Sequence, residues 1–115
     1  MTTADEVVLA LTWRARNEGP VGVSYTVFTH LLSAEGRLVG QHDGLPAQGS
    51  RPTTGWVKGE IIVDVHRMRF KEIGYVGPAT VEIGFYDATT GQRVTTPEGA
   101  DRLVLPVRIE VRPGP

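Results

Sequence analysis

The sequence predicts an all-β domain, and three observations support that prediction. Its 115 residues include 15 Val, 5 Ile and 12 Thr, so 32 residues are β-branched against 16 Ala and Leu. Branching at Cβ restricts a side chain in a helix but suits a pleated sheet. The 14 Gly and 8 Pro are spread along the chain and interrupt the windows that a helix would need. Several segments alternate apolar and polar residues with period two, and none sustains the 3.6-residue period of a helix.

Composition limits the classes of function. The length corresponds to one domain, which we expect to span residues 1–115 with an ordered core at about 6–112. Twelve Lys and Arg against 13 Asp and Glu give a net charge of −1, which disfavours nucleic acid as a partner. The absence of Cys excludes disulfides, thiolate catalysis and Cys-bound metals. We expect no membrane span, because no apolar run approaches the roughly 18–20 residues that cross a bilayer.

Alternation predicts seven strands separated by turn residues. The first strand carries Val7, Leu9, Leu11 and Trp13 on one face. The second strand is partly apolar on both faces, which predicts a central position in the sheet. Pro106 in the last strand cannot donate a ladder hydrogen bond, so we place that strand at an edge or a bulge. The expected ranges are 6–14, 23–32, 37–43, 61–70, 79–86, 92–95 and 103–112.

Strands of this number and spacing indicate an antiparallel two-sheet β-sandwich of immunoglobulin-like type, with a barrel as the alternative. In the fourth strand, Val63 and Val65 face inward if Ile61 does. The stretch 44–60 has no strand pattern, and so long a connection is usually functional or a crossover between sheets. The residues that we expect to be buried are Val7, Leu9, Leu11, Trp13, Val27, Val81, Ile83, Phe85, Val107 and Ile109.

The histidines are the first candidates for chemistry. His30, His42 and His66, with Asp43 and Asp64, could form a metal site or an acid–base pair. Strand periodicity puts His30 and His42 on opposite faces, whereas Asp64 and His66 share a face and could touch. No nucleophile elbow, phosphate loop or zinc-binding His-Glu-x-x-His motif is present. We therefore expect structural or surface roles for these five residues, with no catalytic residue, no metal and no cofactor.

The long connection holds the candidate ligand site, formed by Arg51, Thr53, Thr54 and Trp56. An exposed Trp beside Arg and Thr can stack on a sugar ring while the polar groups hold its hydroxyls. Alternatively, Trp56 plugs the end of the core where the chain crosses between sheets, and this is the reading that we favour from the sequence. The exposure of Trp56 distinguishes the two.

A resemblance to a known family rests on three blocks of sequence. They are YTVFTHLL at 25–32 followed by AEGRLVGQHDG at 34–44, then RPTTGWVKGEIIVD at 51–64, and then VEIGFYDATTGQR at 81–93. Together they resemble a bacterial β-sandwich domain that often lies at the C-terminal end of polytopic membrane proteins of the glycosyltransferase type, which use lipid-linked sugars. The resemblance implies an accessory domain that faces outside the membrane and has no assigned catalytic residue.

We therefore expect a non-catalytic accessory domain of a bacterial cell-envelope or membrane protein that contacts glycans. The alternative is a protein–protein interaction module resembling bacterial proteinase-inhibitor β-sandwiches. An enzyme or metal protein that uses Asp64 and His66 is a third hypothesis. The expected location is extracytoplasmic if the chain is excised from a membrane protein, and cytoplasmic if this is the full chain.

Overall fold

The computed structural model describes residues 1–114 and shows an all-β chain of six antiparallel strands in one curled sheet. Across the sheet the strand order is β1-β4-β3-β2-β5-β6. No helix within residues 1–114 has the length and apolar character needed to cross a membrane. The elements are β1 (Val7–Arg14), β2 (Thr26–Leu32), β3 (Leu38–Gly44), the short 3-10 helices η1 (Pro46–Gly49) and η2 (Thr53–Gly55), β4 (Ile61–Phe70), β5 (Gly77–Tyr86) and β6 (Leu103–Val111).

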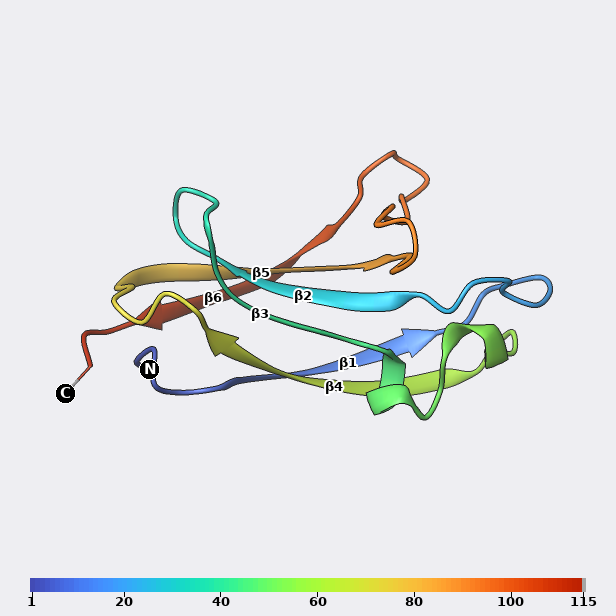
Figure 1. Cartoon of the computed structure of the whole chain (residues 1–115), viewed down its shortest axis with the longest axis horizontal. Coiled ribbons are helices and arrows are strands. Elements are labelled where there is room, and N and C mark those ends of the chain that lie inside the picture. The colour runs from blue at the N-terminus through green and yellow to red at the C-terminus, as the bar shows by residue number, and fades with distance from the viewer. Residues whose placement is uncertain (115) are drawn as a thin grey trace.

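The sheet curls so that β1 and β4 face β2, β5 and β6 across the core (Figure 1). The two halves are joined where β3 pairs with β4, through Gly40 with Phe70 and Gln41 with Arg69. A Cβ atom at Gly40 would lie 2.6 Å from the carbonyl oxygen of Arg69, so this close approach of two backbones requires glycine. Because the join makes one hydrogen-bonded sheet, the predicted two-sheet sandwich with seven strands is not confirmed.

The strand boundaries differ from expectation by more than two residues at two places. The predicted strand at 92–95 is reduced to an isolated bridge between Tyr86 and Arg93. The strand predicted to begin at residue 23 begins at Thr26, because the hydroxyl of Thr53 bonds the Val23 carbonyl and the Tyr25 amide. The Val23 carbonyl and the Tyr25 amide are therefore bonded to the long connection and not to a neighbouring strand. The last strand, β6, lies at the sheet edge, as Pro106 predicted.

The core lies between the facing layers. Val27, Val81 and Ile83 are buried as predicted, and the expected face of β1 and Ile109 are partly buried against the core. Phe85 is also only partly buried. The prediction for Val107 is wrong, since this side chain is 44% exposed. The pairing of β5 with β6 shifts between Thr80 and Glu82, and Val107 lies in the part of the edge strand that this bulge pushes out of register.

The inward face of β4 is the one that carries Asp64 and His66, and not the one that carries Ile61. Ile61 is 56% exposed and Val63 is 63% exposed, so the premise that Ile61 faces inward fails. The residues that β4 buries are Ile62, Asp64, His66, Met68 and Phe70. An acidic residue and a histidine therefore enter the interior of the molecule, where each needs a polar partner.

Candidate functional site

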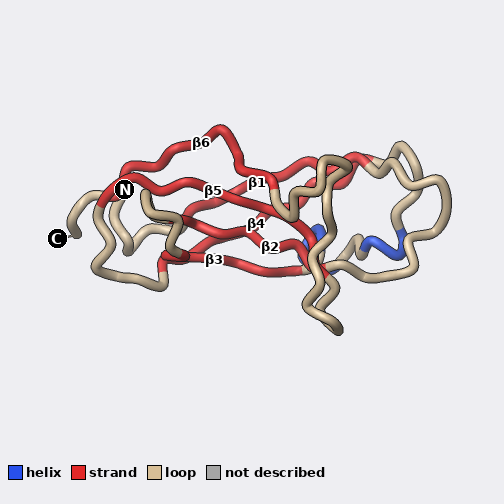
Figure 2. Tube along the Cα trace, turned by 90° about the horizontal axis from the view of Figure 1, so that it is seen from above, coloured by secondary structure: helices blue, strands red, loops and turns tan. Residues whose placement is uncertain are grey.

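An aromatic pocket lies at the end of the molecule where the segments 15–25 and 44–60 come together (Figures 1 and 2). Its volume is about 220 Å³, and Tyr25, Trp56 and Phe85 line it. The Phe85 ring centroid lies 4.6 Å from that of Trp13, 6.1 Å from that of Trp56 and 6.5 Å from that of Tyr25. Rings at these spacings attract each other, which gives the pocket an ordered apolar wall. The other lining residues are Arg14, Ala15, Arg16, Asn17, Val21, Thr53 and Val94.

Hydrogen bonds fix the orientation of Trp56. Its indole N–H donates to the carbonyl oxygen of Arg51 at 2.9 Å, and its own carbonyl accepts from Asn17 Nδ2 at 3.0 Å. The ring meets Phe85 edge-on with an interplanar angle of 82°. The side chain is partly buried, and it lines both the aromatic pocket and a second hollow to which Thr54, Gly55 and Val57 contribute. Trp56 thus packs against the end of the core and also presents surface to two open hollows.

The other three residues of the predicted ligand site have different positions. Thr53 is buried, and its hydroxyl donates to the Val23 carbonyl at 2.6 Å and accepts from the Tyr25 amide at 2.9 Å. It lines the aromatic pocket, but these backbone bonds occupy its polar group. Thr54 is exposed and lines the second hollow, on the other side of Trp56.

Arg51 holds the long connection in place. Its Nε and Nη2 atoms donate to the two carboxylate oxygens of Glu60 at 2.7 and 2.6 Å, and Nη2 also donates to the Gly55 carbonyl at 2.7 Å. The hydrogen bond with Glu60 raises the pKa of Arg51, and the same bond, helped by the Val57 amide, lowers the pKa of Glu60. The guanidinium group of Arg51 therefore stabilises the long connection, and its donors are already used within the protein.

Sequence reasoning missed most of the pocket. Phe85 was expected in the core, and no part in a ligand site was predicted for Tyr25, Arg14 or Arg16. These residues lie on β1 and its following loop, on the segment before β2, and on β5, so no spacing in the sequence links them to Trp56. The only local signal is the pair of arginines that flanks Ala15 directly at the end of a predicted strand.

A second candidate site, which is polar, is buried in the core next to η1. His66 Nε2 lies 2.7 Å from Asp64 Oδ2, as expected for residues two apart on one strand face. Trp13 Nε1 donates to the same oxygen at 3.0 Å, and the Ala47 amide donates to Oδ1 at 2.9 Å. His42 Nδ1 lies 2.9 Å from His66 Nδ1. Burial acts to raise the pKa of Asp64, but the hydrogen bonds from His66, Trp13 and Ala47 outweigh it and leave that pKa lowered.

We call this set of contacts the Asp64 network: it links Asp64 and His66 on β4 to Trp13, His42 and the Ala47 amide. The other two candidates, His30 and Asp43, lie outside it. His30 lies on the face of β2 opposite to that of His42, as predicted, since Thr29 is the residue across from His42. It contacts Glu82 instead, with 3.0 Å between Nδ1 and Oε1. Asp43 is exposed and accepts a hydrogen bond from the Tyr86 hydroxyl at 2.9 Å. Among residues 1–114, no three His, Asp or Glu side chains are grouped so that they could hold a metal ion.

Searches of protein-family models, of curated proteins and of solved structures find no match to this chain. The resemblance of its three sequence blocks to a membrane-associated accessory domain therefore stays a prediction. A function is inferred from the geometry of the aromatic pocket and its surroundings.

Proposed function

We propose that this chain is a non-catalytic accessory domain of a cell-envelope or membrane protein and contacts glycans through the aromatic pocket. The observation that carries the proposal is the convergence of Tyr25, Trp56 and Phe85 on an open pocket of about 220 Å³. This volume is below the roughly 300–1,000 Å³ of pockets for drug-sized ligands, and it suits a single sugar ring. The C–H groups of a sugar form an apolar face that an aromatic ring can cover.

The surroundings of the pocket support the same function. Sugar hydroxyls need hydrogen-bond partners, and Arg14 and Arg16, which line the pocket, carry guanidinium donors. Arg51 and Thr53 keep the connection in one conformation, which lowers the entropic cost of binding. The segments 15–25 and 44–60, which contribute most of the pocket lining, lie at the end of the molecule opposite the two marked chain ends (Figure 1).

We also propose that the fold is an immunoglobulin-like β-sandwich in its finer classification. Two observations support this classification. The layers face each other, and the junction between β3 and β4 is short, with two residue pairs in register. Amide hydrogen exchange tests it. In a sandwich the amides of Gln41 and Phe70 exchange faster than those in the centre of β2, and equal protection would favour a continuous sheet.

Fluorescence of single-tryptophan variants tests the glycan site. The chain has 2 Trp, so Trp13→Phe leaves Trp56 as the only emitter and Trp56→Phe leaves Trp13. We expect iodide to quench Trp56 more strongly than Trp13, and a glycan array probed at high protein concentration to give signals that Trp56→Ala removes. Shallow sugar sites bind with about −4 to −6 kcal/mol, which is a Kd from about a millimolar down to some tens of micromolar. A fully shielded Trp56 together with a silent array would overturn the proposal.

A protein-interaction module is the second candidate, and the edge strand β6 favours it. Val104 is 64% exposed, and Leu103 and Val107 are also exposed on this strand. An exposed apolar edge can pair with an added strand of another protein, although Pro106 removes one backbone donor from it. A panel of purified proteinases gives a direct test of the inhibitor-like form of this hypothesis. Inhibition that Val104→Lys abolishes and Trp56→Ala leaves intact would favour this function over glycan binding.

A further inference from the structure

A basic hollow adjoins the aromatic pocket. It has a volume of about 490 Å³ and is lined by Arg14, Arg16 and Lys58 together with Glu18. Arg14, Ala15 and Arg16 line both the hollow and the aromatic pocket. A ligand whose ring occupies the aromatic pocket can therefore place a substituent between the two arginines.

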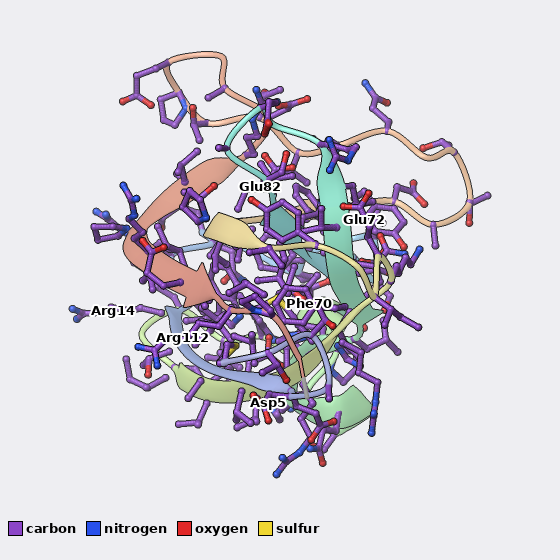
Figure 3. All side chains as sticks on the ribbon, turned by 90° about the vertical axis from the view of Figure 1, so that its left-hand side faces the viewer. Asp5, Arg14, Phe70, Glu72, Glu82 and Arg112 are labelled. Atoms are coloured by element: carbon purple, nitrogen blue, oxygen red, sulfur yellow. The ribbon has the colours of Figure 1, made fainter. Side chains whose placement is uncertain are left out.

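The hollow carries an excess of positive charge that the protein itself does not neutralise. Lys58 Nζ lies 2.7 Å from Glu18 Oε1, so these two charges pair with each other. Over residues 1–114, by contrast, no carboxylate lies within 4.0 Å of the guanidinium nitrogens of Arg14 or Arg16. Figure 3 shows Arg14 reaching away from the ribbon. The chain has a net charge of −1, so these two positive charges are a local feature and not a general basic character.

The chemistry of arginine indicates what the two side chains would bind. A guanidinium group carries only donors, and its planar fork matches a carboxylate with two parallel hydrogen bonds. The ligand must therefore present a negatively charged acceptor group beside an apolar ring face. A hexuronic acid has both features, because its carboxylate is attached to the sugar ring through one bond.

We propose that the ligand is an acidic sugar of the hexuronic acid class, with its ring against Trp56 and Tyr25 and its carboxylate bonded by Arg14 and Arg16. This inference rests on the proposed glycan contact and adds the charge of the sugar. Charge complementarity supports it, since the bound carboxylate would offset positive charge that has no partner within the chain.

Two matched sugars test the inference, methyl β-glucuronide and methyl β-glucoside, which differ only in the oxidation of one exocyclic carbon. Each is titrated into nitrogen-15-labelled protein, and the Trp56 indole and Ala15 amide signals are followed by NMR. We expect the glucuronide to bind about tenfold more tightly at low salt, because charge-assisted hydrogen bonds are about twice as strong as neutral ones. The advantage should shrink as salt is raised.

Substitutions at the rim assign the effect to the two arginines. Arg14→Gln and Arg16→Gln should each remove most of the glucuronide's advantage over the glucoside. Both sugars lose donors to their hydroxyls, but the glucuronide alone loses charge-assisted hydrogen bonds. Lys71→Gln is the matched control, since Lys71 is another exposed cation and follows the far end of β4. It should leave both affinities unchanged.

The outcomes separate this inference from the proposed function. If both sugars shift the Trp56 signal with equal affinity, the acidic-sugar inference is overturned and glycan contact stands. If the glucuronide binds better but both arginine variants keep that advantage, the assignment to Arg14 and Arg16 is wrong. If neither sugar shifts Trp56 and the glycan array is also silent, both proposals are overturned.

Discussion

Replacing Asp64 by Asn tests how much the Asp64 network contributes to stability. The substitution keeps the shape of the side chain but removes its charge and turns one oxygen into a donor. If the new amide nitrogen takes the place of Oδ1, it faces the Ala47 amide, which is itself a donor. If it takes the place of Oδ2, it faces the indole N–H of Trp13 and the ring nitrogen of His66. At least one buried hydrogen bond is therefore lost in either orientation.

The magnitude follows from the number and type of these bonds. A hydrogen bond to a charged group contributes about 1.5–3 kcal/mol, and a neutral one contributes about 0.5–1.5 kcal/mol. Losing one charged bond and weakening the others predicts a decrease of about 2–4 kcal/mol in the free energy of unfolding at pH 7. No discount for solvent screening applies, because the Asp64 side chain is fully buried.

The stability difference should also depend on pH. The pKa of Asp64 is lowered in the folded protein, so its stabilising effect is complete above the unfolded-state pKa of about 4 and is lost as the pH falls through the folded-state pKa. Urea unfolding followed by far-UV circular dichroism should therefore show a gap between wild type and Asp64→Asn that is widest at neutral pH and narrows in acid.

Asp43→Asn is the matched control for this experiment. Asp43 is an exposed carboxylate with one hydrogen bond, to the Tyr86 hydroxyl, so its substitution should change stability by less than about 0.5 kcal/mol. A loss below about 0.5 kcal/mol for Asp64→Asn, or a gap that stays constant from acid to neutral pH, would refute the reasoning.

Three further predictions follow from the core and the sheet. Ile83→Ala should lower the free energy of unfolding by about 2–5 kcal/mol, because Ile83 is 3% exposed and the shorter side chain leaves a cavity. If urea unfolding shows no such loss, Ile83 does not belong to the core. Gly40→Ala should cost about 1–3 kcal/mol and speed hydrogen exchange at the β3–β4 junction, since the new methyl group meets the Arg69 carbonyl. Asp43→Asn should lower the pKa of Tyr86, which burial and then the Asp43 carboxylate raise, and an ultraviolet titration that shows no change would contradict this contact.

Much of the local structure was predictable from the sequence. The range of β4 agrees with the alternating run 61–70. Pro106 predicted an edge or a bulge, and β6 lies at the sheet edge and pairs with β5 across a register shift. The contact between Asp64 and His66 follows from strand geometry, because residues two apart always share a face. These features depend on residues close together in the sequence and on the regular geometry of a strand, so the sequence is enough to predict them.

The face that β4 buries was decided by tertiary structure. Each face of this strand carries three apolar and two polar residues, so counting apolar residues does not decide which face is buried. Asp64 and His66 face the core because Trp13, the Ala47 amide and His42 supply hydrogen bonds from other segments. A buried polar group is tolerated only when such partners are present, and the sequence does not state which residues will be its neighbours.

The candidate site shows the same dependence on tertiary structure. The sequence identified Trp56, but the pocket also needs Tyr25 and Phe85, which the curl of the sheet brings to one end of the molecule. That curl depends in turn on the close backbone approach at Gly40, whose partner lies some thirty residues further along the chain at β4. Alternation located the six segments that become strands, and it also predicted a seventh at 92–95 that is only an isolated bridge. The meeting of distant segments determines the pocket, because the free energy of packing depends on partners that are remote in sequence.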